Sequence, residues 1–296
     1  MAIVATSSST VLLQAIRELA EYRREDPIAT AFNVGNSFYA TNEQWRRAVS
    51  EGKDAQGRKC FREPKTSAEI MAHYRRCASQ VEQQVFATYG IPGEVALRER
   101  IAALAEPGMS VLDFGAGIGS QLLPLVDKGC RCTHADVGGV MMEYAIWRYM
   151  RQWHAEESKR LGESRGPVGV GRGGSFGAGN VLMVELADDY MTAGIPALKS
   201  GVVIDTRPPW TPYLQYDMVI CTEVIEHVTE PEQLVALLAK LVRPGGLFVA
   251  TTSFDDGDGM VPMHLNIDKY DDETFAAKVF PRHGLVPVEH AIFRKT

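Results

Sequence analysis

The sequence predicts an α/β protein in which a mostly helical segment precedes a largely parallel sheet. Apolar residues recur at helical spacing over residues 10–24 and 67–89, and each run begins at a hydroxyl residue that can cap a helix. From residue 109 onward, short strand-like runs alternate with helical runs. That alternation is typical of parallel strands joined by crossover helices, so the sheet is predicted to lie in the second part of the chain.

The individual elements follow from this pattern. The predicted strands are MSVLDF at 109–114, CRCTHADV at 130–137, YDMVIC at 216–221 and LFVATTSF at 247–254, and the predicted helices cover 140–153, 232–242 and 271–280. Residues 26–45 and 51–65 show no clear period, and we interpret them as loops. A further strand has two candidates, of which we prefer SGVVIDTR at 200–207 over VLMVELADD at 181–189.

Residues 155–180 interrupt the alternation. They are rich in glycine and charged residues, a composition that does not suit a core element. We interpret them as an insertion, and two roles remain open for it: a plain surface excursion or a lid.

The composition is that of a globular chain. Of 296 residues, 45% are hydrophobic and 23% are charged, and no apolar run approaches the roughly 18–20 residues that a membrane-spanning helix needs. The N-terminus lacks a signal-peptide pattern, so a cytoplasmic protein is expected. Five cysteines without a CxxC pair suggest neither a disulfide framework nor a cysteine zinc site. The net charge of −6 argues against nucleic acid as a partner, and no pattern indicates an oligomeric state.

The stretch VLDFGAGIGS at 111–120 places a bare backbone beside the end of a strand. Its strand should end near Asp113, and the alternate glycines that follow let the chain turn sharply and bring a ligand against main-chain N–H groups. A nicotinamide fingerprint would need a glycine at Ser120, and no Gly-Lys-Ser/Thr follows as in a phosphate-binding loop. The spacing therefore departs from both of these nucleotide sites.

Asp113 with GAGIG, followed by a second strand that ends in Asp136, resembles the S-adenosylmethionine (SAM) site of class I methyltransferases. YDMVICTEVIEHV and LVRPGGLFVATTSF extend the resemblance over nearly all of residues 105–296. It implies a Rossmann-like, seven-stranded mixed sheet with flanking helices. The implied division is a helical N-terminal cap or substrate region over residues 1–104 and a SAM-binding domain over residues 105–296, which carries the insertion.

The resemblance also implies which residues hold the cofactor. The glycine loop would pack against its amino-acid part, with Asp113 orienting that loop or the cofactor's ammonium group through water. Asp136 would accept hydrogen bonds from both ribose hydroxyls, a role that suits the two oxygens of a carboxylate. The full implied set is Asp113, Gly115, Ala116, Gly117, Asp136, Val137, Asp205 on the adenine side, and Thr222.

The segment EVIEH at 223–227 predicts a catalytic cluster. If it is helical, Glu223, Glu226 and His227 project from one side, at spacings i, i+3 and i+4. With His264, they could hold a divalent metal: oxygen ligands favour magnesium or manganese, and imidazole leaves zinc or iron open. The ExxEH pattern resembles the ubiquinone-type O-methyltransferases and the small-RNA 2′-O-methyltransferases. In the alternative interpretation no metal binds, His227 simply lines the active site and His264 is an ordinary loop histidine.

The predicted function is SAM-dependent methyl transfer to a small molecule, as in small-molecule biosynthesis. A hydroxyl acceptor must lose a proton, and the cluster of His227 and two carboxylates suits that need. Two alternatives stay open: a small-RNA 2′-O-methyltransferase, and a SAM-binding protein of the same fold with a non-methylating role. The predicted acceptor atom is a hydroxyl oxygen, with possible help from the metal, and the identity of the acceptor molecule is not predicted.

Overall fold

The computed structural model describes residues 2–51, 71–72, 74–75, 79–161, 181–186, 215–254, 264–266 and 269–296. Its centre is a seven-stranded sheet with the order β3-β2-β1-β4-β5-β7-β6. The strands are β1 (Ser110–Phe114), β2 (Arg131–Asp136), β3 (Val181–Glu185), β4 (Tyr216–Thr222), β5 (Val242–Thr251), β6 (Leu285–Glu289) and β7 (Ile292–Lys295). The first five pair in parallel, and β7 runs antiparallel to both β5 and β6. The prediction of a Rossmann-like mixed sheet with flanking helices is confirmed.

The strand order positions a ligand site. β1 pairs with β2 on one side and with β4 on the other, so the chain reverses its direction of travel across the sheet at β1. In parallel α/β sheets, ligands bind at such a point, outside the carboxyl ends of the strands. All five residues of β1 are buried, as expected of a central strand covered on both faces. The glycine loop therefore begins at the switch point of the sheet.

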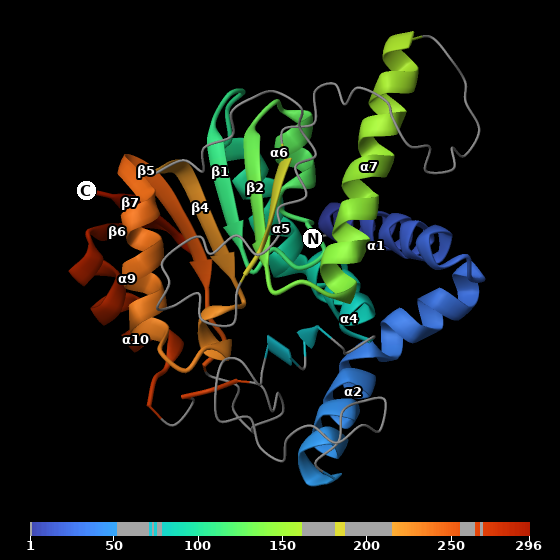
Figure 1. Cartoon of the computed structure of the whole chain (residues 1–296), viewed down its shortest axis with the longest axis horizontal. Helices are drawn as coiled ribbons and strands as arrows, with labels where there is room; N and C mark the ends of the chain where they lie inside the picture. The colour runs from blue at the N-terminus through green and yellow to red at the C-terminus, as the bar shows by residue number, and fades with distance from the viewer. Residues whose placement is uncertain are drawn as a thin grey trace.

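Helices cover both faces of the sheet. They are α1 (Ala2–Arg23), α2 (Pro27–Glu51), α4 (Gln80–Gly90), α5 (Pro92–Leu104), α6 (Leu123–Asp127), α7 (Val140–Leu161), α9 (Pro231–Leu241), α10 (Asp272–Val279) and the short 3-10 helices η1 (Ile225–His227) and η2 (Phe280–His283). Figure 1 shows α9 and α10 on one face and α5, α6 and α7 on the other. Among the described helices, none is long and apolar enough to cross a membrane.

Two apolar clusters fill the space between the sheet and its helices. On one face, Leu234 and Leu238 of α9 pack with Phe248 of β5. On the other face, Ile101 of α5 packs with Val111 of β1. α5 therefore belongs to the core of the sheet, although it precedes the first strand.

A third cluster joins the N-terminal helices to the glycine loop. Leu19 of α1, Val34 of α2 and Val85 of α4 pack around Ile118 of the loop and Tyr144 of α7. Figure 1 shows α4 across the carboxyl ends of the strands. The N-terminal helices thus lie beside the switch point.

The prediction of a loop over residues 26–45 is wrong, because α2 covers Pro27–Glu51. The Asp26 carboxylate accepts hydrogen bonds from the backbone N–H groups of Ile28 and Ala29, at 2.9 and 3.0 Å, and so caps the helix. The buried positions include Thr30 and Ser37, whose hydroxyls donate to backbone carbonyls one helical turn earlier. The sequence prediction depended on apolar residues at helical spacing, and hydroxyl residues occupy some of those buried positions, so the pattern was not recognised.

The strand beside β2 is Val181–Glu185, the stretch that we ranked second. Its first four residues are buried, which fits a run of apolar side chains placed between helices and a neighbouring strand. The preferred stretch, 200–207, lies outside the described residues, and Asp205 lies there too. The glycine-rich insertion also lies outside them from residue 162 to residue 180.

Candidate cofactor and acceptor site

The glycine loop leaves β1 and turns against α4. Gly117 has φ +52°, in the left-handed region that favours glycine, and a Cβ there would lie 2.0 Å from Oε1 of Gln84. The same Gln84 oxygen accepts a hydrogen bond from the backbone N–H of Ile118 at 3.2 Å. The bare backbone predicted from the sequence is therefore needed for a close approach between the loop and α4.

Asp136 ties the end of β2 to this loop. Its Oδ2 accepts a hydrogen bond from the Gly117 N–H at 2.5 Å, and its Oδ1 accepts one from the Val137 N–H at 2.6 Å. Burial raises the pKa of Asp136 to about 6, although both N–H groups and the positive charge of Arg75 act to lower it. The structure thus brings together Asp136 and Gly117, two members of the expected cofactor set.

Asp113, one residue before the end of the central strand, has an unsatisfied carboxyl oxygen. The residue is only 2% exposed, and among the described residues Oδ2 has no hydrogen-bond partner. Burial, and then the charge of Asp136, raise the pKa of Asp113 to about 8. Near neutral pH this carboxyl therefore holds a proton until a ligand supplies a compensating charge or donor.

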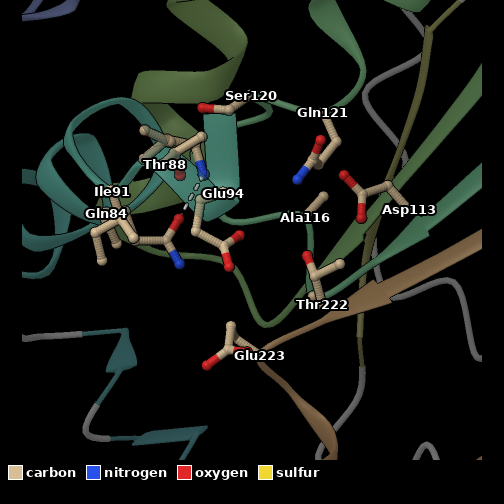
Figure 2. Close-up of a pocket in the computed structure, with 13 residues that line it drawn as sticks. Gln84, Thr88, Ile91, Glu94, Asp113, Ala116, Ser120, Gln121, Thr222 and Glu223 are labelled. Carbon is tan, nitrogen blue, oxygen red and sulfur yellow. Dashed lines mark hydrogen bonds between the residues drawn. The ribbon is translucent and has the colours of Figure 1, made fainter. Parts of the chain in front are cut away.

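A cavity of about 150 Å³ opens between the glycine loop, α4, α5 and the end of β4. Its lining consists of Gln84, Ala87, Thr88, Ile91, Glu94, Asp113, Gly115, Ala116, Ile118, Ser120, Gln121, Thr222 and Glu223. Figure 2 shows the side chains of Glu94, Asp113 and Gln121 converging on it. Five predicted site residues line it, namely Asp113, Gly115, Ala116, Thr222 and Glu223.

The sequence analysis missed the lining residues of α4 and α5. Gln84 and Glu94 are polar residues on amphipathic helices, where exposed and site-facing positions share the same pattern. Gln121 could have been found, because it follows the glycine loop by one residue.

The acid at the end of the strand beside β2 is Glu185, whereas Asp205 was the expected residue. It ends β3 and pairs in register with Asp136 at the end of β2. The backbone N–H of Leu186 donates to the Asp136 carbonyl at 2.7 Å and holds the two strand ends together. An acid at the carboxyl end of the neighbouring strand therefore exists, but it comes from the other candidate stretch.

The EVIEH segment is less helical than the spacing argument assumed. Glu223 has φ +54°, and only residues 225–227 form a short 3-10 turn. The Glu223 carboxylate instead accepts a hydrogen bond from the Ser253 hydroxyl at 2.6 Å, beyond the end of β5. Glu223 is therefore not one of the residues that the structure groups as possible metal ligands, although its charge still acts on Glu226.

The structure groups Glu226, His227 and His264 instead. Their ligand atoms all lie within 4.8 Å of one another. His227 Nε2 lies 3.9 Å from Glu226 Oε1, and the rings of His227 and His264 have centroids 4.8 Å apart. The backbone N–H of Leu265 donates to the Glu226 carbonyl at 2.7 Å, which fixes the His264 loop beside η1. We call this group the Glu226 cluster.

The carboxyl of Glu226 is suited to a cation. The residue is 0% exposed, and neither carboxyl oxygen has a hydrogen-bond partner among the residues that the structure describes. Burial, followed by the charges of Glu223 and Asp272, raises its pKa well above the usual range. One carboxylate and two imidazoles form a recognised donor set for zinc or iron, and the residues present therefore fit a divalent metal.

A comparison with protein families identifies the domain. Residues 81–286 match the model of a family described as a methyltransferase domain. The chain belongs to this family. It is a class I methyltransferase domain, whose cofactor is SAM. The match begins in α4, so it includes both helices that line the cavity.

Individual relatives of the chain are methyltransferases too. The chain is similar to the ubiquinone biosynthesis O-methyltransferase of Aeromonas salmonicida, at 29% identity over 145 residues, covering 49% of this chain and 43% of the relative. The corresponding enzyme of Methylocella silvestris is 28% identical over 167 residues, covering 56% of this chain and 46% of the relative. The aligned parts thus span less than half of these relatives. Among solved structures, an O-methyltransferase family protein from Burkholderia thailandensis is 14% identical, covering 89% of this chain and 71% of that chain, with a TM-score of 0.47.

Proposed function

We propose that this protein transfers the methyl group of SAM to a hydroxyl oxygen of a small molecule. The observation that carries the proposal is the Glu226 cluster. Two of its members, Glu226 and His227, come a few residues after Thr222 and Glu223, which line the cavity. The cluster supplies an imidazole and a buried carboxyl where a proton has to leave the acceptor. The similarity to enzymes named as O-methyltransferases supports an oxygen acceptor.

We assign the cofactor to the carboxyl ends of the strands. The backbone of Gly115, Ala116 and Gly117 would pack against its amino-acid part, with Asp113 close to the ammonium group. Asp136 already accepts two backbone hydrogen bonds, and its carboxylate oxygens keep lone pairs for the ribose hydroxyls. Glu185 replaces Asp205 as our proposed acid on the adenine side, because it ends the strand next to Asp136.

The reaction depends on positioning and on removal of a proton. When bound, SAM supplies an electrophilic methyl group on a positively charged sulfur. The cavity walls would hold the acceptor oxygen in line with the bond that breaks, and alignment of this kind can contribute roughly 7–11 kcal/mol. His227 would accept the hydroxyl proton, because its side chain is partly exposed beside the buried Glu226 carboxyl.

We also propose that a divalent cation assists the reaction. Glu226, His227 and His264 would hold it, and it would lower the pKa of the acceptor hydroxyl. The Glu223 carboxylate accepts a hydrogen bond from the Ser253 hydroxyl, and Glu223 is not part of the Glu226 cluster. We therefore propose that Glu223 lines the cavity and is not a metal ligand. Without a cation, Glu226 would keep its proton and His227 would act as the base alone.

The helices before the sheet complete the proposal. We propose that residues 1–104 act as a cap over the cofactor and acceptor, with α4 and α5 bringing Gln84 and Glu94 to the cavity. Both helices are also part of the methyltransferase domain. α5 packs against the sheet, and the family match begins at residue 81, in α4.

The test uses purified protein, SAM with a carbon-13 methyl group, and a panel of phenols, catechols, amines and activated carbon acids. We expect release of S-adenosylhomocysteine (SAH) with the label in a methyl ether, which its carbon chemical shift identifies. Chelation with EDTA should slow the reaction, and addition of magnesium, manganese or zinc should restore it. Label found only on nitrogen or carbon, or cofactor binding without turnover on any acceptor of the panel, would contradict the proposal of an oxygen acceptor.

A further inference from the structure

The cavity beside the glycine loop is strongly acidic. Glu94 from α5, Asp113 from β1 and Glu223 after β4 all line it, and no lysine, arginine or histidine occurs among the described residues of its wall. Burial and the charge of Glu223 raise the pKa of Glu94 to about 7. Carboxyl groups gathered in a partly buried space repel one another when ionised, and a cation that enters relieves that repulsion.

Unsatisfied buried acceptors show that the cavity is built for a ligand. Asp113 is 2% exposed, and its Oδ2 has no hydrogen-bond partner among the described residues. Gln121 is 8% exposed, and its Oε1 likewise has no hydrogen-bond partner there. Both residues line the cavity, and Figure 2 shows their side chains directed into it. Buried polar atoms normally have partners, so these two oxygens indicate a ligand with donors or positive charge.

The carboxyls divide between two ends of the cavity. The acid that perturbs Asp113 is Asp136, at the glycine-loop end. The acid that perturbs Glu94 is Glu223, at the end of β4, where the Glu226 cluster begins. Figure 2 shows the Glu94 carboxyl in the middle of the cavity, between α4 and Thr222. Glu94 therefore lies toward the Glu223 side of the cavity, next to the part of the site in which methyl transfer is proposed.

We propose that Glu94, supported by Glu223, is a specificity-determining residue that makes this site bind SAM in preference to its demethylated product, SAH. The two molecules share the adenosine, the ammonium and the carboxylate, and they differ in one methyl group and one positive charge on sulfur. A carboxylate near that sulfur attracts SAM and gains nothing from the neutral thioether of the product. The inference depends on the cofactor of the family and is independent of the acceptor.

This arrangement would also favour turnover. When the carbon–sulfur bond breaks, its electron pair stays on sulfur, the methyl group passes to the acceptor, and the positive charge near Glu94 is lost. The attraction that held the cofactor then disappears at the moment when the product has to leave. We therefore expect weak inhibition by SAH.

Calorimetric titration of the whole chain with SAM and with SAH tests the proposal. The wild type should bind SAM several-fold more tightly. The Glu94→Gln variant should lose about tenfold in SAM affinity and less than about twofold in SAH affinity. Glu94→Asp keeps the charge and should keep the preference. Glu99→Gln, at an exposed position of the same helix, is the matched control and should leave both affinities unchanged.

Three results would overturn the inference: equal affinity of the wild type for the two molecules, an equal loss of both affinities in Glu94→Gln, or no loss at all. Circular dichroism and thermal unfolding of each variant show whether it is folded, and the Glu94→Asp variant provides the comparison if Glu94→Gln is not. The titrations contain no methyl acceptor. Their outcome therefore does not depend on whether the protein methylates any acceptor of the panel, and the two proposals can fail separately.

Discussion

Replacing Gly117 with alanine should lower the free energy of unfolding, and two contributions to this loss can be worked out from the structure. The first is backbone strain, because φ is +52° and the left-handed region costs a residue with a Cβ roughly 1–2 kcal/mol. The second is a steric conflict, because the new Cβ would lie 2.0 Å from Gln84 Oε1. Moving that side chain breaks its hydrogen bond with the Ile118 N–H, a net loss of about 1 kcal/mol. The expected total is roughly 2–3 kcal/mol of unfolding free energy.

Two other glycines separate the two parts. Gly129 has φ +82°, and a Cβ added there would meet nothing within 4 Å, so Gly129→Ala carries the strain alone and should cost roughly 1–2 kcal/mol. Gly35 lies inside α2 with open space around it, so Gly35→Ala should stabilise the protein by up to about 1 kcal/mol. The same chemical change is thus expected to have three different effects.

Urea unfolding followed by circular dichroism measures all three variants, and a double-mutant cycle isolates the contact. Gln84→Ala removes the side chain that obstructs the new methyl group. The double variant Gly117→Ala with Gln84→Ala should therefore be more stable than the sum of the single effects predicts, by about 1 kcal/mol. Strictly additive effects, or a Gly117→Ala variant as stable as the wild type, would refute the assigned packing between α4 and the glycine loop.

Four further predictions concern the site. Asp136→Ala should weaken SAM binding at least about tenfold in calorimetry, because it removes a carboxylate that orders the loop and that we propose as acceptor from the ribose hydroxyls; unchanged binding would remove Asp136 from the site. His227→Ala should lower kcat by roughly 10²–10⁴ and leave the Kd of SAM within about twofold, whereas a shift in Kd alone would rule out a role as base. Zinc or manganese should raise the Tm of the wild type and not of His264→Ala, and equal shifts would contradict binding at the Glu226 cluster. Since the pKa values of Glu94 and Asp113 are raised to about 7 and about 8, a cation binds better once they ionise, so SAM affinity should increase from pH 6 to pH 8; a flat profile would contradict this.

The same raised pKa values have an opposite effect on the unliganded protein. The ordinary pKa values of the two carboxyls are 4.5 and 3.8, so between about pH 4 and pH 8 the folded state binds more protons than the unfolded state. By linkage, these groups make stability decrease as pH rises through that range. Saturating SAM should reduce the decrease, and thermal unfolding with and without SAM measures the difference.

Local sequence was sufficient wherever a residue's neighbours in the chain determine its role. The alternation of short apolar runs and helical runs predicted the sheet, and the carboxyl ends of parallel strands meet at one edge of a sheet, which brings Asp113, Gly117 and Asp136 together. The helix α2 was missed for an equally local reason: Thr30 and Ser37 satisfy their hydroxyls within the helix and are buried as if they were apolar.

Contacts distant in sequence decided the rest. Glu94 and Gln84 lie on helices that precede the first strand, and only the packing of α4 and α5 against the glycine loop and the sheet turns these polar positions into cavity walls. The third strand was decided by pairing with β2, where Val181–Glu185 rather than residues 200–207 supplies the buried run.

The amino-acid sequence by itself determined the alternation of strands and helices and the glycine loop after the first strand, because strand periodicity and glycine spacing are properties of a continuous chain. Only the tertiary structure decided which side chains meet. It gathered Glu226, His227 and His264, placed Glu223 against Ser253, and brought the Glu94 carboxyl into the cavity. The physical reason is that side-chain direction depends on the backbone angles of each turn and on packing between distant segments, and neither follows from residue spacing alone.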